Sequence, residues 1–166
     1  GRGRRGREWV SSPGNLAVSF LMTETIAAPV AATLGFAAGL AACEACRALA
    51  PGLDFAVKWP NDVLAGGDKV AGILLESEAQ HGALAIVTGF GLNLAEAPEG
   101  MAFPATSLAK LGTATAPEDA FAIFSDAFAD MLGMWRHGQG FADIRTLWLE
   151  RARGLGGSVS IRTGER

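Results

Sequence analysis

Residues that usually build metal sites and hydrolytic sites are scarce in this sequence. Its 166 residues include two histidines, His81 and His137, and two cysteines, Cys43 and Cys46. A zinc site needs two ligands beyond this cysteine pair, and HExxH, a Ser-His-Asp spacing and the Walker A lysine motif are all missing. We therefore expect no metal-binding residues, and we interpret the cysteines as buried or half-buried thiols of a cytosolic protein, where disulfides are rare.

Extremes of charge and composition are missing as well. Charged residues make up 19% of the chain and apolar residues 49%, and the net charge is −3. This balance excludes a disordered chain, which needs low hydrophobicity and high net charge, and it excludes a uniformly basic nucleic-acid binder. The 22 glycines follow no G-X-Y period, which excludes collagen. A chain of 166 residues has the length of one domain and can bury ~70% of its extended surface.

A long uncharged run covers residues 26–43. Its length approaches that of a membrane span, but alanine dominates it and contributes little to insertion. We interpret the run as part of a core helix over residues 27–49, which Ala50-Pro51-Gly52 ends.

Shorter apolar runs predict the strands of a sheet. We expect strands over residues 15–22, 55–59, 70–76 and 83–88, and Gly66-Gly67 predicts the tip of a hairpin. One further helix should begin at Pro117, and a second should cover residues 141–153. A strand should follow from residue 158. The element order indicates an α/β fold of the α+β kind, a mixed sheet with helices. Helical spacing predicts one core-facing stripe on the helix after Pro117, formed by Phe121, Phe124, Phe128, Met131 and Trp135.

Positive charge is concentrated at the start of the chain, in the segment Gly1-Arg-Gly-Arg-Arg-Gly-Arg7. A basic segment on an otherwise acidic chain indicates a local anion site rather than a general polyanion surface. Glycines let backbone N–H groups approach a ligand, and arginines offer planar donors for phosphate or carboxylate. The alternative is a basic arm of the arginine-glycine type that binds nucleic acid.

Two further motifs contain candidate site residues. In Lys58-Trp-Pro-Asn-Asp62 a lysine ends an apolar strand, where it can neutralise an anionic substrate or charge developing on phosphorus. The alternative is an ordinary edge lysine beside a core tryptophan. In Gly89-Phe-Gly91-Leu-Asn93, glycines at a strand end allow close approach of a ring, and Asn93 can read polar groups. Leu94 occupies the place of the third glycine of a dinucleotide fingerprint, which argues against a Rossmann site. With the arginine segment, these motifs predict an anionic, nucleotide-like ligand on a sheet.

These blocks resemble a known enzyme family. GRGRRGR at 1–7, KWPND at 58–62, KVAGILLE at 69–76 and GFGLN at 89–93 are similar in order and spacing to the biotin protein ligases (biotin–[acetyl-CoA-carboxylase] ligases), and Ala105-Thr-Ser-Leu108 also suits them. The resemblance implies a catalytic domain related to class II aminoacyl-tRNA synthetases over residues 1–155 and the start of an SH3-like β domain over 156–166. The Ser/Thr-rich segment and the Gln that precede GRGRRGR in the family are missing, so we expect a fragment cut at both ends.

The resemblance also implies an activity. The family joins biotin and Mg-ATP into biotinyl-5′-AMP, releases pyrophosphate, and transfers biotin to a lysine of a biotin carboxyl carrier protein domain. The implied cofactors are ATP and Mg²⁺, and the implied setting is a cytoplasmic enzyme, with a homodimer as one expectation, no membrane, and nucleic acid only if an upstream repressor domain exists. Alternatives are a lipoyl or octanoyl transferase on the same fold and a nucleic-acid-binding module that uses the arginine-glycine segment.

Site residues are carried over from the family by position. The implied catalytic residues are Lys58, which would contact the biotin carboxylate and then the phosphoryl oxygen, and Arg4. The implied biotin-binding residues are Arg2, Gly3, Arg4, Lys58, Gly89 and Gly91. The implied residues for ATP and the adenylate are Arg4, Arg5, Arg7, Trp9 and Asn93, with Trp9 near the adenine.

Overall fold

The computed structural model describes residues 1, 3, 6, 9–100 and 103–158 of the chain. Its described elements are β1 (Leu16–Glu24), α1 (Ala28–Ala32), α2 (Leu34–Leu49), β2 (Phe55–Lys58), β3 (Asp62–Ala65), β4 (Asp68–Gln80), β5 (Ala83–Leu92), α3 (Pro117–Trp135), the short 3₁₀ turn η2 (Arg136–Gly138) and α4 (Phe141–Arg151). The strand expected from residue 158 onward lies outside the described residues.

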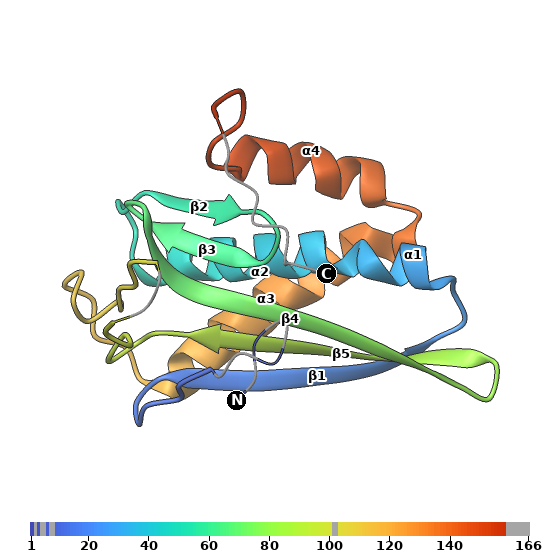
Figure 1. Ribbon diagram of the computed structural model, residues 1–166, viewed down its shortest axis with the longest axis horizontal. Coiled ribbons are helices and arrows are strands. Elements are labelled where there is room, and N and C mark those ends of the chain that lie inside the picture. The colour runs from blue at the N-terminus through green and yellow to red at the C-terminus, as the bar shows by residue number, and fades with distance from the viewer. Residues whose placement is uncertain (2, 4–5, 7–8, 101–102, 159–166) are drawn as a thin grey trace.

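The described strands form one sheet in the order β1-β5-β4-β3-β2 (Figure 1). Each neighbouring pair runs antiparallel, and parallel contact is found in two isolated bridges, Val57 with Ala152 and Lys69 with Ala105. Gly66 and Gly67 form the turn between β3 and β4 with φ of +59° and +116°, a conformation that glycine adopts without strain. The predicted α+β fold and its hairpin are confirmed.

The described helices pack on one face of the sheet, and none of them lies on the opposite face (Figure 1). Side chains of a strand alternate between the two faces. On β5, Ile86, Phe90 and Leu92 point toward the helices and are buried in the core. Gly89 and Gly91 therefore belong to the opposite face. This alternation decides where a ligand can approach the sheet.

The helix expected over residues 27–49 is interrupted. The structure ends α1 at Ala32 and begins α2 at Leu34. The Thr33 hydroxyl donates to the Val30 carbonyl at 2.6 Å and accepts from Trp135 Nε1 at 2.8 Å, so the break is tied to the end of α3. Among the described residues, this α1–α2 segment is the one stretch of helix long and apolar enough to span a membrane, and 61% of its apolar window is buried within the protein. That burial agrees with its interpretation as a core helix.

Both cysteines lie in the buried part of α2 and are free thiols. Burial raises the pKa of the Cys43 thiol to about 12, and the adjacent Glu44 carboxylate adds to the rise. Burial also raises the pKa of the Cys46 thiol. The interpretation of the pair as buried thiols is confirmed, and both side chains are protonated at neutral pH.

Aromatic rings fill the space between the sheet and α3. The centroid of the Phe90 ring of β5 lies 4.1 Å from the ring centroid of Phe124 and 5.2 Å from that of Phe128. The ring centroid of Phe20 of β1 lies 5.0 Å from that of Phe128. Phe124, Phe128 and Trp135 are buried as the helical stripe predicted. Phe121 is 41% exposed, so its assignment to the core was wrong.

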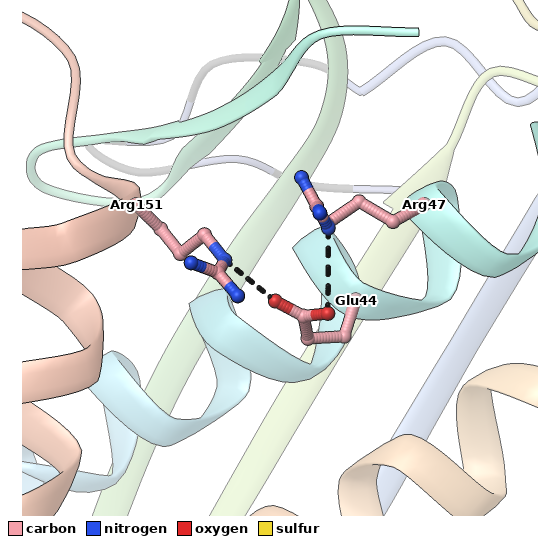
Figure 2. Close-up of polar contacts among 3 residues, drawn as sticks. All are labelled: Glu44, Arg47 and Arg151. Carbon is pink, nitrogen blue, oxygen red and sulfur yellow. Dashed lines mark hydrogen bonds and ion pairs between the residues drawn. The ribbon is translucent and has the colours of Figure 1, made fainter. Parts of the chain in front are cut away.

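An ion pair connects α4 to α2 (Figure 2). Arg151 Nε lies 2.8 Å from one Glu44 carboxylate oxygen, and Arg47 Nε lies 3.5 Å from the other. The hydrogen bond to Glu44 raises the pKa of Arg151. Directly after α4, the backbone N–H of Arg153 donates to the Val57 carbonyl at 2.9 Å. The end of α4 is thereby attached to β2, one residue from Lys58.

Removal of the Phe128 ring should destabilise the protein strongly. We expect Phe128→Ala to lower the free energy of unfolding by about 3–5 kcal/mol, because it leaves a cavity among the rings of the core. The matched control is Phe121→Ala on the same helix, which should cost less than about 1 kcal/mol because that side chain is partly in solvent. Urea unfolding followed by circular dichroism measures both values, and equal losses would contradict this description of the core.

Candidate functional site

A cavity of about 610 Å³ opens on the face of the sheet that carries no helices. Its floor is formed by β1, β5 and β4, and its sides by the segments before β1, around the β2–β3 turn and after β5. The floor residues are Ala17, Ser19, Gly72, Leu74, Gly89 and Gly91, and the side residues are Gly1, Gly3, Trp9, Asn61, Asp62, Lys69, Asn93, Pro98, Phe103 and Ala105.

Glycines in the floor make room for a tryptophan. A Cβ atom added to Gly91 would lie 2.2 Å from the Trp9 ring, and one added to Gly72 would lie 2.9 Å from it. Gly91 and Gly72 face each other across the β4–β5 ladder. The indole of Trp9 therefore rests on the bare backbone of the two glycines, and any side chain at either position would occupy the space of the ring. Lys69 Nζ lies 5.3 Å from the centroid of the same ring, within the range of a cation–π contact.

Gly89 and Gly91 do not end their strand, contrary to the sequence prediction. β5 continues to Leu92, and Gly89 pairs with Leu74 on one side and Ser19 on the other. Pairing with both neighbours keeps these glycines in the ladder, although glycine by itself weakens a strand. The glycines provide an uninterrupted, side-chain-free surface inside the sheet rather than a turn at its edge.

Lys58 of the KWPND motif and Lys69 of the KVAGILLE block lie at different distances from the cavity. Lys69 lines the cavity and its ammonium forms an ion pair of 2.5 Å with Asp62, which begins β3. Lys58 is half-buried, and its ammonium lies 4.7 Å from the centroid of the Phe103 ring, which lines the cavity. Lys58 is thus separated from the cavity by one aromatic ring. No role was predicted for Lys69, although it begins the KVAGILLE block and follows the Gly66-Gly67 turn.

Asn93 reaches the cavity as a buried amide. Its Nδ2 donates to the Thr106 carbonyl at 3.1 Å, and its backbone bonds to Val70 and Leu108. Its Oδ1 is buried and has no hydrogen-bond partner among the described residues. A buried acceptor without a partner costs about 1–3 kcal/mol. A ligand that brings an N–H group to this oxygen would remove that cost.

Several predicted site residues cannot be placed. Arg2, Arg4, Arg5 and Arg7 lie outside the described residues, so their roles stay predictions. Of the segment they belong to, Gly1 and Gly3 line the cavity, and the Trp9 N–H donates to the Gly1 carbonyl at 3.0 Å. Within the described ranges, no group of three or more His, Cys, Asp or Glu side chains could hold a metal ion.

Comparison with known proteins now places the chain. The profile of the biotin/lipoate A/B protein ligase family matches residues 1–93, which is more than half of its length. This chain belongs to that family. It is 43% identical over 175 aligned residues to the biotin–[acetyl-CoA-carboxylase] ligase of Paracoccus denitrificans, an alignment that covers 99% of the chain and 71% of that protein. It is 41% identical over 118 residues to the enzyme of the same name from Mycobacterium tuberculosis, covering 69% of the chain and 43% of that protein.

Solved structures agree with this membership. The biotin protein ligase of Aquifex aeolicus, solved in complex with biotin and ATP, matches with a TM-score of 0.75 and 28% identity, covering 93% of this chain and 65% of that one. The chain therefore spans less than two thirds of that structure and under half of the mycobacterial enzyme. The predicted family and fold are confirmed. The division at residues 155–156 stays a prediction, because most of the second segment lies outside the described residues.

Contact between Trp9 and Gly91 can be tested directly. We expect Gly91→Ala to displace the indole, because the new methyl carbon would lie 2.2 Å from the ring. Gly89→Ala is the matched control, since its nearest neighbour would be a backbone oxygen at an ordinary 3.7 Å. The measurement is the ¹H–¹⁵N spectrum of the indole N–H groups, in which Trp9→Phe assigns the Trp9 signal. An unmoved Trp9 signal in Gly91→Ala would contradict the described packing.

Proposed function

We propose that this chain carries the adenylate-forming site of a biotin protein ligase. Such an enzyme joins biotin and ATP into biotinyl-5′-AMP with release of pyrophosphate, and then transfers biotin to a lysine of a carboxyl carrier protein. The observation that supports this most strongly is the glycine-floored cavity bordered by Trp9, in a chain similar to a ligase that was solved with biotin and ATP.

Shape and polarity of the floor suit the flat, mostly apolar rings of biotin. Gly89 and the neighbouring Leu74 and Val87 offer backbone and aliphatic surface, and the Ser19 hydroxyl adds a polar group beside Gly89. A pocket of this kind, mainly apolar with a few placed polar groups, is typical of small-molecule sites. We assign the biotin end of the adenylate to this part of the cavity.

Charge neutralisation is the main chemical task of the first step. The biotin carboxylate and the α-phosphate repel each other, so attack requires that both be held in line among cations. Lys58 is proposed as one such cation, and Lys69, whose ammonium is paired with Asp62, is the second at the cavity. The long side chain of Lys58 would exchange its contact with Phe103 for the carboxylate and later the phosphoryl oxygen. Arg2, Arg4, Arg5 and Arg7 would complete this set from the segment before Trp9.

The nucleotide would occupy the side of the cavity that contains Asn93. Its unpaired Oδ1 is suited to accept a hydrogen bond from the 6-amino group of adenine. Trp9 supplies an aromatic face at the adjoining side of the floor. Mg²⁺ would arrive as Mg-ATP, because magnesium commonly binds through substrate phosphates and one or two carboxylates. Asp62 and Glu76 are the described carboxylates that line the cavity.

The carrier protein, a cytoplasmic location and a homodimer are proposed from family membership alone. The family also contains lipoate enzymes, so the acyl substrate needs its own control. Exchange of ³²P-pyrophosphate into ATP should depend on added biotin and not on added lipoate or octanoate. Exchange driven by lipoate would assign the chain to the other branch of the family.

Replacement of Lys58 should impair the chemistry. We expect Lys58→Ala to lower the rate of biotin-dependent pyrophosphate exchange by about a hundredfold, as loss of one charge-stabilising group typically does. The matched control is Lys110→Ala, which removes an exposed lysine that does not line the cavity and should leave exchange unchanged. A Lys58→Ala variant with full activity would overturn the role proposed for this lysine.

Binding of the intermediate should stabilise the fold. A non-hydrolysable biotinyl-AMP analogue at a hundredfold excess over its Kd should raise the free energy of unfolding by about 2.7 kcal/mol. Thermal unfolding of the wild type with and without the analogue measures this, and AMP with free biotin is the comparison. If binding to RNA or DNA with a steep salt dependence stabilised the protein instead, the nucleic-acid alternative would replace the ligase.

A further inference from the structure

One side chain outside the motifs and outside the cavity lining ties a side of the cavity to the start of β1. Asn15 directly precedes β1, and its Oδ1 accepts hydrogen bonds from three consecutive backbone N–H groups, those of Leu94 at 3.0 Å, Ala95 at 2.9 Å and Glu96 at 3.1 Å. Its Nδ2 donates to the Glu96 carbonyl at 2.8 Å. One amide thus satisfies four backbone groups that lie about eighty residues away in the sequence.

The segment held by Asn15 is the one that forms the nucleotide side of the cavity. Residues 93–100 and 103–105 contribute Asn93, Pro98, Phe103 and Ala105 to the lining. The β1–β5 ladder ends at Leu16 and Leu92, so Asn15 continues the connection between the two strands beyond their last pair. Gly14 lies against the same segment, since a Cβ added there would be 3.0 Å from the Ala95 Cβ.

Other contacts hold this segment as well, including the backbone bonds from the Asn93 N–H to the Val70 carbonyl and from the Lys69 N–H to the Pro104 carbonyl, both at 2.9 Å. Ser107 Oγ donates to the Ala95 carbonyl at 3.0 Å, and the Ala109 N–H donates to the Leu94 carbonyl at 2.8 Å. Asn15 is the described side chain that ties residues 94–96 to the start of β1. Without it, three N–H groups would lose their acceptor, and the residues that directly follow Asn93 would lose this attachment to the sheet.

We infer that Asn15 is a positioning residue for the nucleotide half of the site, acting through residues 94–96 on the Asn93 amide. This inference rests on the proposed function. The biotin half should depend on Asn15 far less, because Gly89, Gly91 and Ser19 are fixed by the β1–β5–β4 ladders. A positioning role predicts a change in the KM for ATP with little change in the KM for biotin, whereas a general structural role would change both.

The test uses biotin-dependent pyrophosphate exchange by the full chain. Asn15→Leu keeps the size of the side chain but removes the acceptor, and we expect the KM for ATP to rise about tenfold while the KM for biotin changes less than about twofold. ITP lacks the 6-amino group of ATP. In the same variant the ratio of the KM for ITP to the KM for ATP should fall, because Asn93 would no longer be aligned with that amino group. Asn15→Asp keeps an oxygen acceptor for the three N–H groups and should restore most of the affinity for ATP.

The outcomes decide between the two ideas. Equal changes in both KM values, an unchanged ATP preference, or an Asn15→Asp variant as impaired as Asn15→Leu would overturn the positioning role while leaving the proposed function intact. Absence of biotin-dependent exchange in the wild type would overturn the proposed function and this inference with it. If Asn15→Leu does not fold, Asn15→Ala, which admits water to the three N–H groups, is measured in its place and judged by the same criteria.

Discussion

Pairing of β5 with β1 on one side and β4 on the other is the constraint on which the site depends. Because this strand is held in register on both sides, its alternate residues must face opposite ways. Phe90 faces α3 and joins the aromatic core, while Gly89 and Gly91 leave the other face bare. The same strand thus anchors the core and forms the cavity floor. A slip of one residue would exchange these faces and abolish both.

Much of the fold could be predicted because local patterns and burial agree. Apolar runs located β1, β2, β4 and β5 to within a few residues, the Gly66-Gly67 hairpin indicated β3, and Pro117 marked the start of α3. Two predictions failed for reasons that a local pattern does not contain. The helix break lies at Thr33, whose hydroxyl accepts a hydrogen bond from Trp135, a residue distant in sequence. The end of β5 was placed too early because glycine favours turns in isolation, whereas here the ladders on both sides keep it extended.

Candidate-site residues that belong to a sequence motif could be predicted, and those defined by their packing contacts could not. Asn93 reached the cavity as the GFGLN motif indicated, and Lys58 came to lie one ring away from it. Lys69 and Asn15 were missed because their importance comes from what they touch. Asn15 finds its partners in residues 94–96, and no spacing within the sequence announces that contact. The surroundings of the Trp9 ring, set by two glycines from different strands, could be recognised only in three dimensions.

Both native thiols are buried and protonated, which gives the chain a property useful to the experimenter. A maleimide reagent needs an exposed thiolate, so native Cys43 and Cys46 should not react with it while the protein is folded. A single cysteine introduced at Leu21, which is 72% exposed on the open face of β1, could carry a fluorophore or a spin label without a cysteine-free background. Because these thiols are buried in the helix layer, the cavity face of the sheet can be labelled at a chosen site, and distances can be measured there with and without added ligands.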